Sequence, residues 1–266
     1  MYDLIDEERP ATIRVGLIRT ETSSDQYFML ATEPYDQGRV EHYISLIDKY
    51  LDEDIDVLVA PEYTFFAGRP LTVEEKDELI SSMAERTKDR DLLLLPGSYV
   101  WCDDQGLHNT LPVIYGGEVI RAYDKKVDGG DQKIADRYWR DFVPGTESGV
   151  IPYKDLELGV EVCADHFKSN GRGGVSNPGQ LLTEAGPDSL DLQLIVSCGM
   201  SIHERSLAVR ENGYALICDG KEWGRSWPSV EVVMRMPDTD GEHHTQLIDP
   251  TEVHDDLHIY ELSLNK

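Results

Sequence analysis

Apolar runs of strand length alternate along the chain with stretches in which apolar residues recur at helical spacing. The runs predict strands at Ile13–Ile18, Val57–Ala60, Leu92–Leu95, Asn109–Tyr115, Glu118–Tyr123, Leu156–Val162, Leu192–Val196, Tyr214–Cys218, Val230–Met236, Thr245–Ile248 and Leu257–Leu264. The amphipathic stretches predict helices at Val40–Leu51, Leu71–Arg86 (with Thr72 as its N-cap), Gln180–Glu184 and Ile202–Asn212. This alternation indicates an α/β fold.

The connections between these elements refine the picture. Gly116-Gly117 separates two predicted strands, which indicates a tight hairpin, and hairpins among strand–helix units predict sheets of mixed direction. The polar, glycine-rich segment Asp124–Gly149 predicts a long loop, and long loops in compact domains are often functional. Because no repeat, low-complexity tract or linker divides the chain, we expect residues 1–266 to form a single domain.

Composition narrows the partners and the location. The 51 acidic residues outnumber the 25 Lys and Arg, and the net charge of −26 would repel nucleic acid and anionic membranes. The same acidity would suit a cytoplasm of high salt. No apolar run is long enough to cross a bilayer, and Met1–Pro10 lacks the basic and apolar regions of a signal peptide. We therefore expect a cytoplasmic protein.

The four cysteines fit neither a disulfide scaffold nor a CxxC zinc pattern. Cys102, Cys198 and Cys218 lie in or beside apolar runs, and we expect them to be small buried hydrophobic residues. Cys163 differs because it directly follows the predicted strand Leu156–Val162. Strand ends are where α/β proteins present reactive groups to solvent.

Glu62 and Lys125 share this setting with Cys163, since each follows an apolar strand. A thiol reacts as the thiolate, so it needs a base. A poorly solvated carboxylate can supply that base because desolvation raises its pKa. A lysine ammonium would lower the thiol pKa and stabilise an oxyanion, with the backbone N–H of Ala164 as a second donor. Together these residues predict a site for acyl transfer.

Each residue taken alone has an ordinary alternative. A strand-end Glu62 or Lys125 is usually a solvated turn residue, and Cys163 alone could equally fill a core. His166 suggests a Cys–His dyad with Cys163, although so short a turn is expected to direct the imidazole away from the thiol.

Other histidines are weaker candidates. A histidine-rich patch near the C-terminus could bind a metal, but its irregular spacing favours solvated side chains. Its members are His243, His244, His254 and His258. His203 and Trp223 follow predicted strands and are candidates for the lining of a substrate pocket.

Three blocks occur in a distinctive order: Ala60-Pro61-Glu62, Tyr123-Asp124-Lys125 and Gly159-Val160-Glu161-Val162-Cys163-Ala164-Asp165. They resemble the Pro-Glu, Tyr-x-Lys and Gly-x-x-x-Cys-x-Asp blocks of the nitrilase (carbon–nitrogen hydrolase) superfamily. Three further segments are similar to that family, the last of them to a Glu-Asn stretch on a helix: His108-Asn109-Thr110, Phe142-Val143-Pro144-Gly145 and Arg210–Tyr214. The resemblance extends from about Ile13 to Leu264.

The resemblance implies a four-layer α-β-β-α sandwich with mixed sheets and no metal or organic cofactor. By resemblance, Glu62 is the general base, Lys125 stabilises the oxyanion and Cys163 is the nucleophile. It further implies a homodimer or larger homo-oligomer that takes a small-molecule amide or nitrile. We favour an amidase acting on a primary or N-carbamoyl amide, with nitrile hydrolysis by the same residues as the alternative.

Two departures from the family pattern limit how far the family's residue roles and substrates can be applied to this sequence. Many members have a second glutamate between the lysine and the Pro-Gly segment, whereas the acids here are Asp128, Asp131, Asp136 and Asp141. Either an aspartate substitutes or the position is lost. A Gly- and Asn-rich insertion at about residues 167–190 prevents the substrate from being carried over. Lys126 adjoins Lys125, but the Tyr-x-Lys spacing selects Lys125.

Two other classes of function compete with this one. A metal-dependent phosphoesterase on a similar sandwich could use Glu62 and Asp165 as ligands, but a paired-histidine site is lacking and the acidity disfavours phosphate substrates. A non-catalytic binding protein could keep the fold. The intact Glu62, Lys125 and Cys163 argue against that reading.

Overall fold

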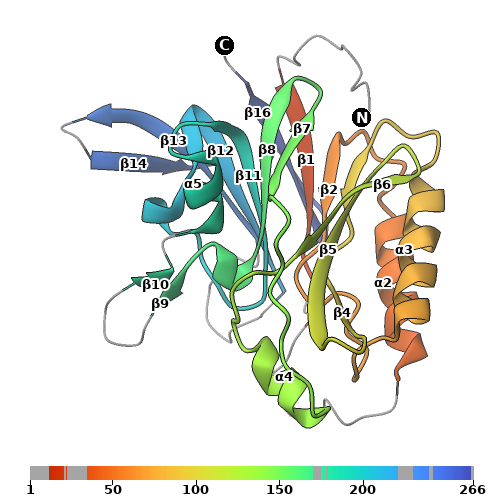
Figure 1. Cartoon of the computed structure of the whole chain (residues 1–266). Coiled ribbons are helices and arrows are strands. Elements are labelled where there is room, and N and C mark those ends of the chain that lie inside the picture. Colours follow the sequence, from red (N-terminus) through yellow and green to blue (C-terminus); the bar gives the residue numbers. More distant parts are fainter. Residues whose placement is uncertain are drawn as a thin grey trace.

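The structure, a computed structural model, describes residues 12–20, 22, 35–169, 175–177, 179–220, 230–239 and 242–264. Trp223 and residues 170–174 of the predicted insertion lie outside these ranges. Two β-sheets lie face to face, with helices α2 and α3 against the outside of one and α5 against the outside of the other (Figure 1). This is the predicted α-β-β-α sandwich.

The first sheet has eight strands in the order β15-β16-β1-β2-β3-β5-β4, with β6 paired to β5. Their bounds are β1 Thr12–Ile18, β2 Val57–Val59, β3 Leu93–Leu95, β4 Tyr99–Cys102, β5 Leu107–Tyr115, β6 Glu118–Asp124, β15 Glu252–Val253 and β16 Leu257–Ser263. Strands β1, β2 and β3 run parallel, and the hairpin β5–β6 forms where Gly116-Gly117 predicts it. The sheet is therefore mixed.

The second sheet has six strands in the order β14-β13-β12-β11-β8-β7. Their bounds are β7 Val150–Tyr153, β8 Leu156–Val162, β11 Leu190–Ser197, β12 Val209–Asp219, β13 Val230–Thr239 and β14 Glu242–Leu247. The small pair β9 Lys168–Ser169 and β10 Val175–Asn177 stands apart from it. Parallel pairing of β8, β11 and β12 brings the carboxyl ends of these strands to one edge, where Cys163 follows β8.

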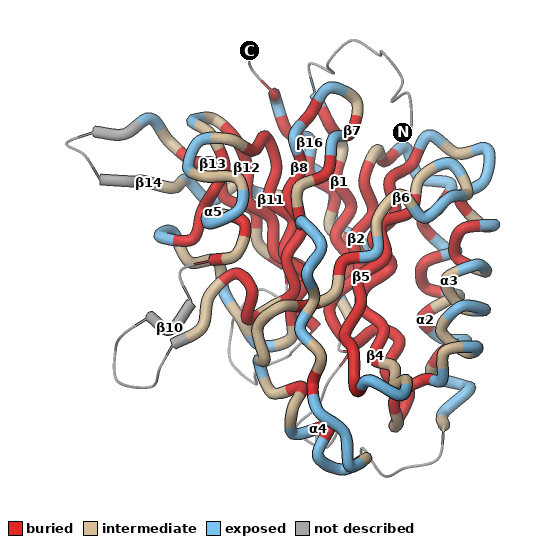
Figure 2. The backbone as a smooth tube through the Cα atoms, in the orientation of Figure 1, coloured by how far each residue is buried: buried red, intermediate tan, exposed pale blue. Residues whose placement is uncertain are grey.

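The helices are α2 Gln37–Asp48, α3 Val73–Thr87, α4 Asp131–Arg137 and α5 Gln180–Ala185, with 3-10 turns at Cys163–Asp165 and Glu204–Ser206. Among the described residues, none combines the length and apolar character that crossing a bilayer requires. Alternate strand residues face different layers: Val57 and Val59 pack between the sheets, whereas Leu58 packs under α2 and α3. Buried backbone accordingly fills the middle of the molecule in Figure 2.

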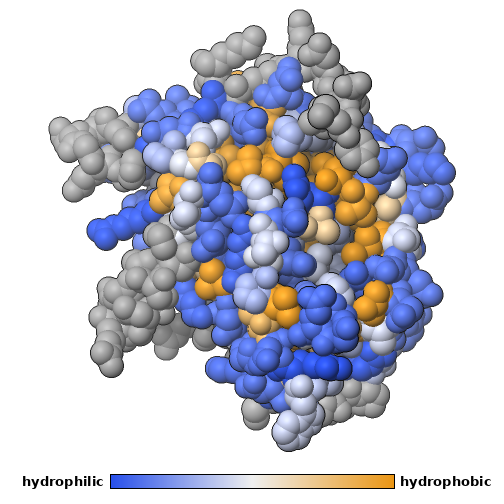
Figure 3. Space-filling view, in the orientation of Figure 1, coloured by the Kyte–Doolittle hydropathy of each residue, from blue (hydrophilic) through white to orange (hydrophobic). Residues whose placement is uncertain are grey.

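The surface reflects the acidic composition. Hydrophilic residues dominate the face seen in Figure 3, and apolar residues appear between them mainly in the middle of the view. Within the described ranges, the exposed large apolar side chains are Val119, Trp139, Leu247 and Val253, which come from separate segments. Exposed apolar side chains scattered singly are normal for a folded domain.

Two element predictions are wrong. Ile202–Asn212 is not a helix, because β12 begins at Val209 and pairs with both β11 and β13, so only a 3-10 turn remains at Glu204–Ser206. The Arg210–Tyr214 segment therefore lies on a strand. Asp124–Gly149 is not loop throughout, since it contains α4, where the Asp128 carboxylate accepts hydrogen bonds from the N–H groups of Gly130 (2.8 Å) and Gln132 (3.1 Å).

The start of α3 yields a stability prediction. The Thr72 hydroxyl accepts from the Glu75 N–H (3.2 Å), and the Glu75 carboxylate accepts from the Thr72 N–H (2.9 Å), which is a complete capping box. We expect Thr72→Ala to lower the free energy of unfolding by about 1 kcal/mol, measured by urea denaturation. Ser81→Ala, an exposed change within the same helix, is the control. Equal losses in both variants would contradict the assignment.

Candidate active site

The three predicted residues meet at the ends of three strands. Glu62 follows β2, Lys125 directly follows β6, and Cys163 directly follows β8 of the other sheet. The Lys125 Nζ donates to Glu62 Oε1 at 2.7 Å, and both side chains are 1% exposed. The thiol of Cys163 is close enough to Glu62 to lower the pKa of that carboxyl, although burial and Lys125 have larger effects. The structure therefore brings Glu62 and Lys125 into contact, with Cys163 near the Glu62 carboxylate.

Backbone geometry sets the position of Cys163. Its φ of 47° lies in the left-handed region, which is uncommon for a residue other than glycine. Strain of this kind persists where the surroundings hold the chain firmly, and it occurs often at functional sites. The strand β8 ends abruptly there and the chain turns into Ala164 and Asp165. Cys163 as a whole residue is partly exposed at the tip of an otherwise buried strand, although burial of its thiol raises the thiol pKa.

The loop that carries Glu62 is equally constrained. The Glu62 N–H donates to the Ser197 carbonyl at 3.3 Å, which joins the loop to the end of β11 in the second sheet. Gly97 has a φ of +88°, and a Cβ there would lie 2.3 Å from the carbonyl oxygen of Pro61. Only glycine allows this approach without moving the Pro61-Glu62 turn. Both sheets thus fix the position of the carboxylate.

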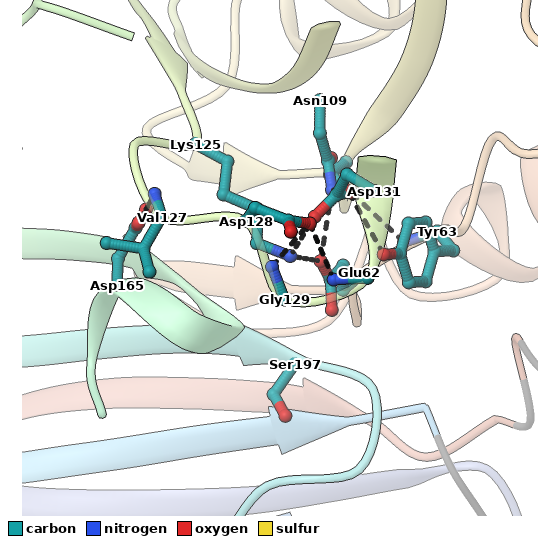
Figure 4. A network of polar contacts seen from close by, with 12 residues as sticks. Glu62, Tyr63, Asn109, Lys125, Val127, Asp128, Gly129, Asp131, Asp165 and Ser197 are labelled. Carbon is teal, nitrogen blue, oxygen red and sulfur yellow. Dashed lines mark hydrogen bonds and ion pairs between the residues drawn. The ribbon is translucent and has the colours of Figure 1, made fainter. Parts of the chain in front are cut away.

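Asp131, at the start of α4, completes the environment of the lysine. Its Oδ2 lies 2.8 Å from Lys125 Nζ, and it is fully buried (Figure 4). Its Oδ1 accepts from Tyr63 Oη (3.0 Å) and Asn109 Nδ2 (2.9 Å). Of the four aspartates between the lysine and the Pro-Gly segment, Asp131 is the one that contacts Lys125. The sequence left open which aspartate, if any, would do so.

Asn109 is a residue that the sequence reasoning missed as part of the site. Its amide donates to both Glu62 Oε1 (3.0 Å) and Asp131 Oδ1 (2.9 Å), so it links the two carboxylates that contact Lys125. Its position within the His108-Asn109-Thr110 segment, next to a predicted strand, was the available signal. Tyr63, which follows Glu62, was missed as well.

The pKa values of the two carboxyl groups, Glu62 and Asp131, shift in opposite directions. Burial raises the pKa of Glu62 despite the attraction of Lys125 and the hydrogen bond from Cys163. Burial also acts on Asp131, but Lys125, Asn109 and the Gly129 N–H outweigh it and hold its pKa below the ordinary value. Two carboxyl groups whose pKa values are driven apart commonly take different roles. Asp131 is thus the permanent counter-ion of Lys125, and Glu62 is the group able to accept a proton.

Lys125 stays charged, but the thiol does not ionise readily. Burial would lower the pKa of Lys125, yet Asp131 and Glu62 raise it well above its usual value. Burial and the charge of Glu62 raise the pKa of Cys163 well above its usual value, and the lowering effect of Lys125 is smaller. The predicted effect of Lys125 on the thiol pKa is therefore present in the expected direction, but burial and Glu62 outweigh it.

Asp165 connects the cysteine turn to the chain beyond Lys125. Its carboxylate accepts from the N–H groups of Lys126 (3.0 Å) and Val127 (2.7 Å) and from the Tyr123 hydroxyl (2.9 Å). Burial nevertheless raises the pKa of Asp165 to about 7. These contacts occupy the Asp165 carboxylate with the chain beyond Lys125. No group of three or more His, Cys, Asp or Glu suited to a metal occurs in the described part of the chain.

The remaining cysteines only partly match expectation. Cys218 is buried, and its thiol donates to the carbonyl of Ile18 at 3.1 Å. Cys102 and Cys198 are partly exposed, so the expectation of full burial is wrong for them. Cys198 lies just past β11, where its backbone lowers the pKa of the Cys163 thiol, a smaller effect than burial. His166 points to Glu161 Oε2 at 2.9 Å, as expected of a turn too short for a dyad.

Comparison with solved structures establishes the fold. Nit3 of Saccharomyces cerevisiae, a member of branch 10 of the nitrilase superfamily, is 15% identical with a TM-score of 0.58, over 96% of this chain and 91% of that one. An amidase from Nesterenkonia sp. is 18% identical with a TM-score of 0.59, over 97% and 92% of the two chains. Variants of the amidase from Nesterenkonia sp. AN1 are in complex with acrylamide and with butyramide. No protein-family model and no curated protein sequence matches the chain.

The raised pKa of Asp165 predicts a pH dependence of stability. Because the folded-state pKa of about 7 exceeds the ordinary value of 3.8, the contribution of Asp165 to stability is complete below about pH 4 and is lost as the pH rises to 7. The wild-type advantage over Asp165→Asn in free energy of unfolding should therefore shrink by a few kcal/mol across this range. Urea denaturation at several pH values measures it, with the exposed Asp136→Asn as control. An advantage that grows with pH would refute the assignment.

The charge of Glu62 predicts a change in the cysteine. In Glu62→Gln the negative charge beside the thiol is lost and Lys125 is less neutralised, so the thiol pKa should fall by about one to three pH units. The pH dependence of thiolate ultraviolet absorbance, corrected with Cys163→Ala, measures this. Glu157→Gln, at an exposed carboxylate of β8, should leave the pKa unchanged. A higher pKa in Glu62→Gln would show that the two side chains do not interact as described.

Proposed function

We propose that this chain is a carbon–nitrogen hydrolase that cleaves a small-molecule amide through an acyl-enzyme on Cys163. The observation that carries the proposal is the convergence of a thiol, a base-competent carboxylate and a buried ammonium from three strand ends. The fold shared with nitrilase-superfamily structures supports the same conclusion independently of the site. We further propose that residues 1–266 act as one catalytic domain.

Acylation begins with attack of the Cys163 sulfur on the amide carbon. The thiol proton passes to Glu62 as the carbon–sulfur bond forms, which is required because the thiol pKa is raised. The Oε2 atom of Glu62 has no hydrogen-bond partner among the described residues, so it is open to that proton. Glu62 then gives the proton to the nitrogen as the carbon–nitrogen bond breaks, and ammonia or an amine leaves.

Lys125 stabilises the negative charge on the substrate oxygen. Two of its three N–H bonds are directed to Glu62 and Asp131, and the third is available for the oxyanion. The backbone N–H of Ala164 is the second donor in this proposal. A Cβ on Gly129 would lie 3.1 Å from both Lys125 Nζ and Ala164 Cβ, so glycine keeps the space beside them open.

Hydrolysis of the thioester reuses the same groups. Glu62 takes a proton from water as the water oxygen attacks the acyl carbon, and the proton returns to the sulfur when the carbon–sulfur bond breaks. The products are the carboxylic acid and the free thiol. Asp131 does not exchange protons in this scheme, since its lowered pKa keeps it ionised beside Lys125.

A primary or N-carbamoyl amide is the substrate class we favour. The Nesterenkonia sp. AN1 amidase, similar in fold, is seen with acrylamide and butyramide, which are small primary amides. Nitrile hydrolysis by the same three residues is the alternative. A cytoplasmic location and a homodimer or larger homo-oligomer remain predictions, which cell fractionation and light scattering of the purified protein would test.

Incubation with a panel of small amides, N-carbamoyl compounds and nitriles, followed by intact mass spectrometry, tests the function. We expect an acyl adduct on the wild type with at least one amide, and none on Cys163→Ala. Glu62→Gln should lower turnover by about 100-fold or more. Cys102→Ala, which removes a partly exposed thiol elsewhere, should keep full activity. Turnover that survives in Cys163→Ala, or that a chelator abolishes, would refute the proposal.

A further inference from the structure

A buried polar cluster lies on the outer face of the second sheet, beside the proposed nucleophile. Glu161, His166 and Gln193 are each 0% exposed. Their neighbours Val160, Val162, Leu192 and Leu194 pack between the two sheets, so Glu161 and Gln193 project to the opposite face, toward α5. Nothing in the proposed chemistry uses these three side chains. A buried carboxylate is costly unless it is paired and hydrogen-bonded, so its contacts indicate its purpose.

Glu161 holds the cluster together. Its Oε1 accepts from the Leu181 N–H at 3.0 Å, at the start of α5. Its Oε2 accepts from His166 Nδ1 at 2.9 Å and from Gln193 Nε2 at 2.8 Å. One carboxylate thus connects the cysteine strand, the turn that follows it, the neighbouring strand β11 and the helix α5.

His166 connects this cluster to the chain that follows β11. Its Nε2 accepts from the His203 backbone N–H at 2.9 Å. A backbone N–H can only donate, so Nε2 carries no proton and Nδ1 carries the proton that is donated to Glu161. Glu161 therefore selects the tautomer of His166 that can bind His203.

Residues 202–208 need such partners because they do not form the predicted helix. The 3-10 turn supplies two backbone hydrogen bonds within the segment, from the Ser206 N–H to the His203 carbonyl (2.9 Å) and from the Leu207 N–H to the Glu204 carbonyl (3.2 Å). Other buried backbone groups of the segment must be paired elsewhere. His166 accepts from His203, and Gln193 Oε1 accepts from the Ala208 N–H at 2.9 Å. Gln193 Nε2 also donates to the Ser206 carbonyl at 3.2 Å. The cluster replaces the missing helical hydrogen bonds.

The chain just before this segment lies beside Cys163, the proposed nucleophile. Cys198 lies five residues before His203 and two residues beyond Val196, which pairs with Val162, so its backbone lies near Cys163 and lowers the pKa of that thiol. The His203 ring also stacks on Phe167, with ring centroids 3.9 Å apart and an interplanar angle of 7°. Residues 198–203 are therefore held against the turn of residues 163–167 at two points. A displacement of His203 would therefore also shift Cys198, which lies beside Cys163.

We propose that His166 is a positioning residue, which fixes residues 198–203 through its Nε2 atom and thereby sets the position of the Cys198 backbone beside the sulfur of Cys163. The inference rests on the proposed function, since it gives His166 a part in preparing the nucleophile. His166 itself does not touch the reacting atoms. Its contribution is to the geometry and reactivity of the thiol.

Two substitutions separate the two nitrogens of His166. In His166→Gln the side-chain oxygen can occupy the place of Nε2 and accept from His203, whereas His166→Asn keeps only a donor near Nδ1. We expect His166→Asn to slow alkylation of Cys163 by iodoacetamide by about tenfold, as loss of one buried hydrogen bond implies. His166→Gln should stay within about threefold of wild type. His254→Asn, at an exposed histidine, is the control.

Turnover provides the second readout, with the amide identified by the substrate panel. The effect of His166→Asn should fall on kcat, with KM changed by less than about twofold, because the substrate contacts are not altered. Equal behaviour of the Asn and Gln variants, or wild-type alkylation in both, would overturn the proposal. If His166→Asn does not fold, Phe167→Leu removes the other attachment of His203 and should slow alkylation by about threefold. An unchanged rate in that variant would count equally against it.

The experiments distinguish failure of the proposed amidase function from failure of the proposed positioning role of His166. Alkylation of Cys163 needs no substrate, so its dependence on His166 is measurable even if no amide is hydrolysed. A wild type without amidase activity, but with the expected alkylation pattern, would refute the function and leave the positioning role standing. An active wild type whose turnover and alkylation rate are both unchanged by substitution of His166 would support the function and refute the positioning role.

Discussion

A lysine ammonium that is 1% exposed is the constraint around which the site is organised. Removing such a charge from water is expensive, and Lys125 remains charged only because Glu62 and Asp131 lie within 2.8 Å of it. Asn109 then holds the two carboxylates together. Since these groups come from the ends of β2, β5 and β6 and from α4, the ion pairs require the first sheet to be fully assembled.

The same burial explains why one carboxylate can act as a base. Two carboxylates share a single ammonium, and Asp131 receives the additional donors Tyr63 and Gly129. Asp131 is therefore the better stabilised anion, while the pKa of Glu62 rises. The raised pKa of Glu62 is what the proposed transfer of the Cys163 proton to Glu62 requires. The division of roles follows from hydrogen bonding and not from residue type.

The second sheet contributes Cys163, the proposed nucleophile, and the residues that pack behind it. The inner face of β8 is apolar and packs against the first sheet, whereas its outer face carries Glu161. Polar contacts on that outer side anchor His166, and through it the chain after β11. The cysteine turn is thus constrained from both faces of its own sheet. This arrangement suits a residue held at a φ of 47°.

The local sequence pattern was sufficient to predict the features of this protein that depend only on neighbouring residues. Strand runs, the Gly116-Gly117 hairpin and the Thr72 cap were predictable because periodicity, turn geometry and capping act over a few residues. The ordered blocks around Glu62, Lys125 and Cys163 were equally visible. The match to the sandwich fold followed from them.

Tertiary structure decided what depends on distant partners. Ile202–Asn212 has helical spacing, but pairing of Val209–Asp219 with the strands on either side overrides that weak preference. Four aspartates were equivalent in sequence until α4 placed Asp131 beside Lys125. The pKa of Cys163 rises because remote segments bury it. Sequence determined which reactive groups are present and in what order, and folding determined their contacts, because desolvation and hydrogen bonding arise only when separate strands meet.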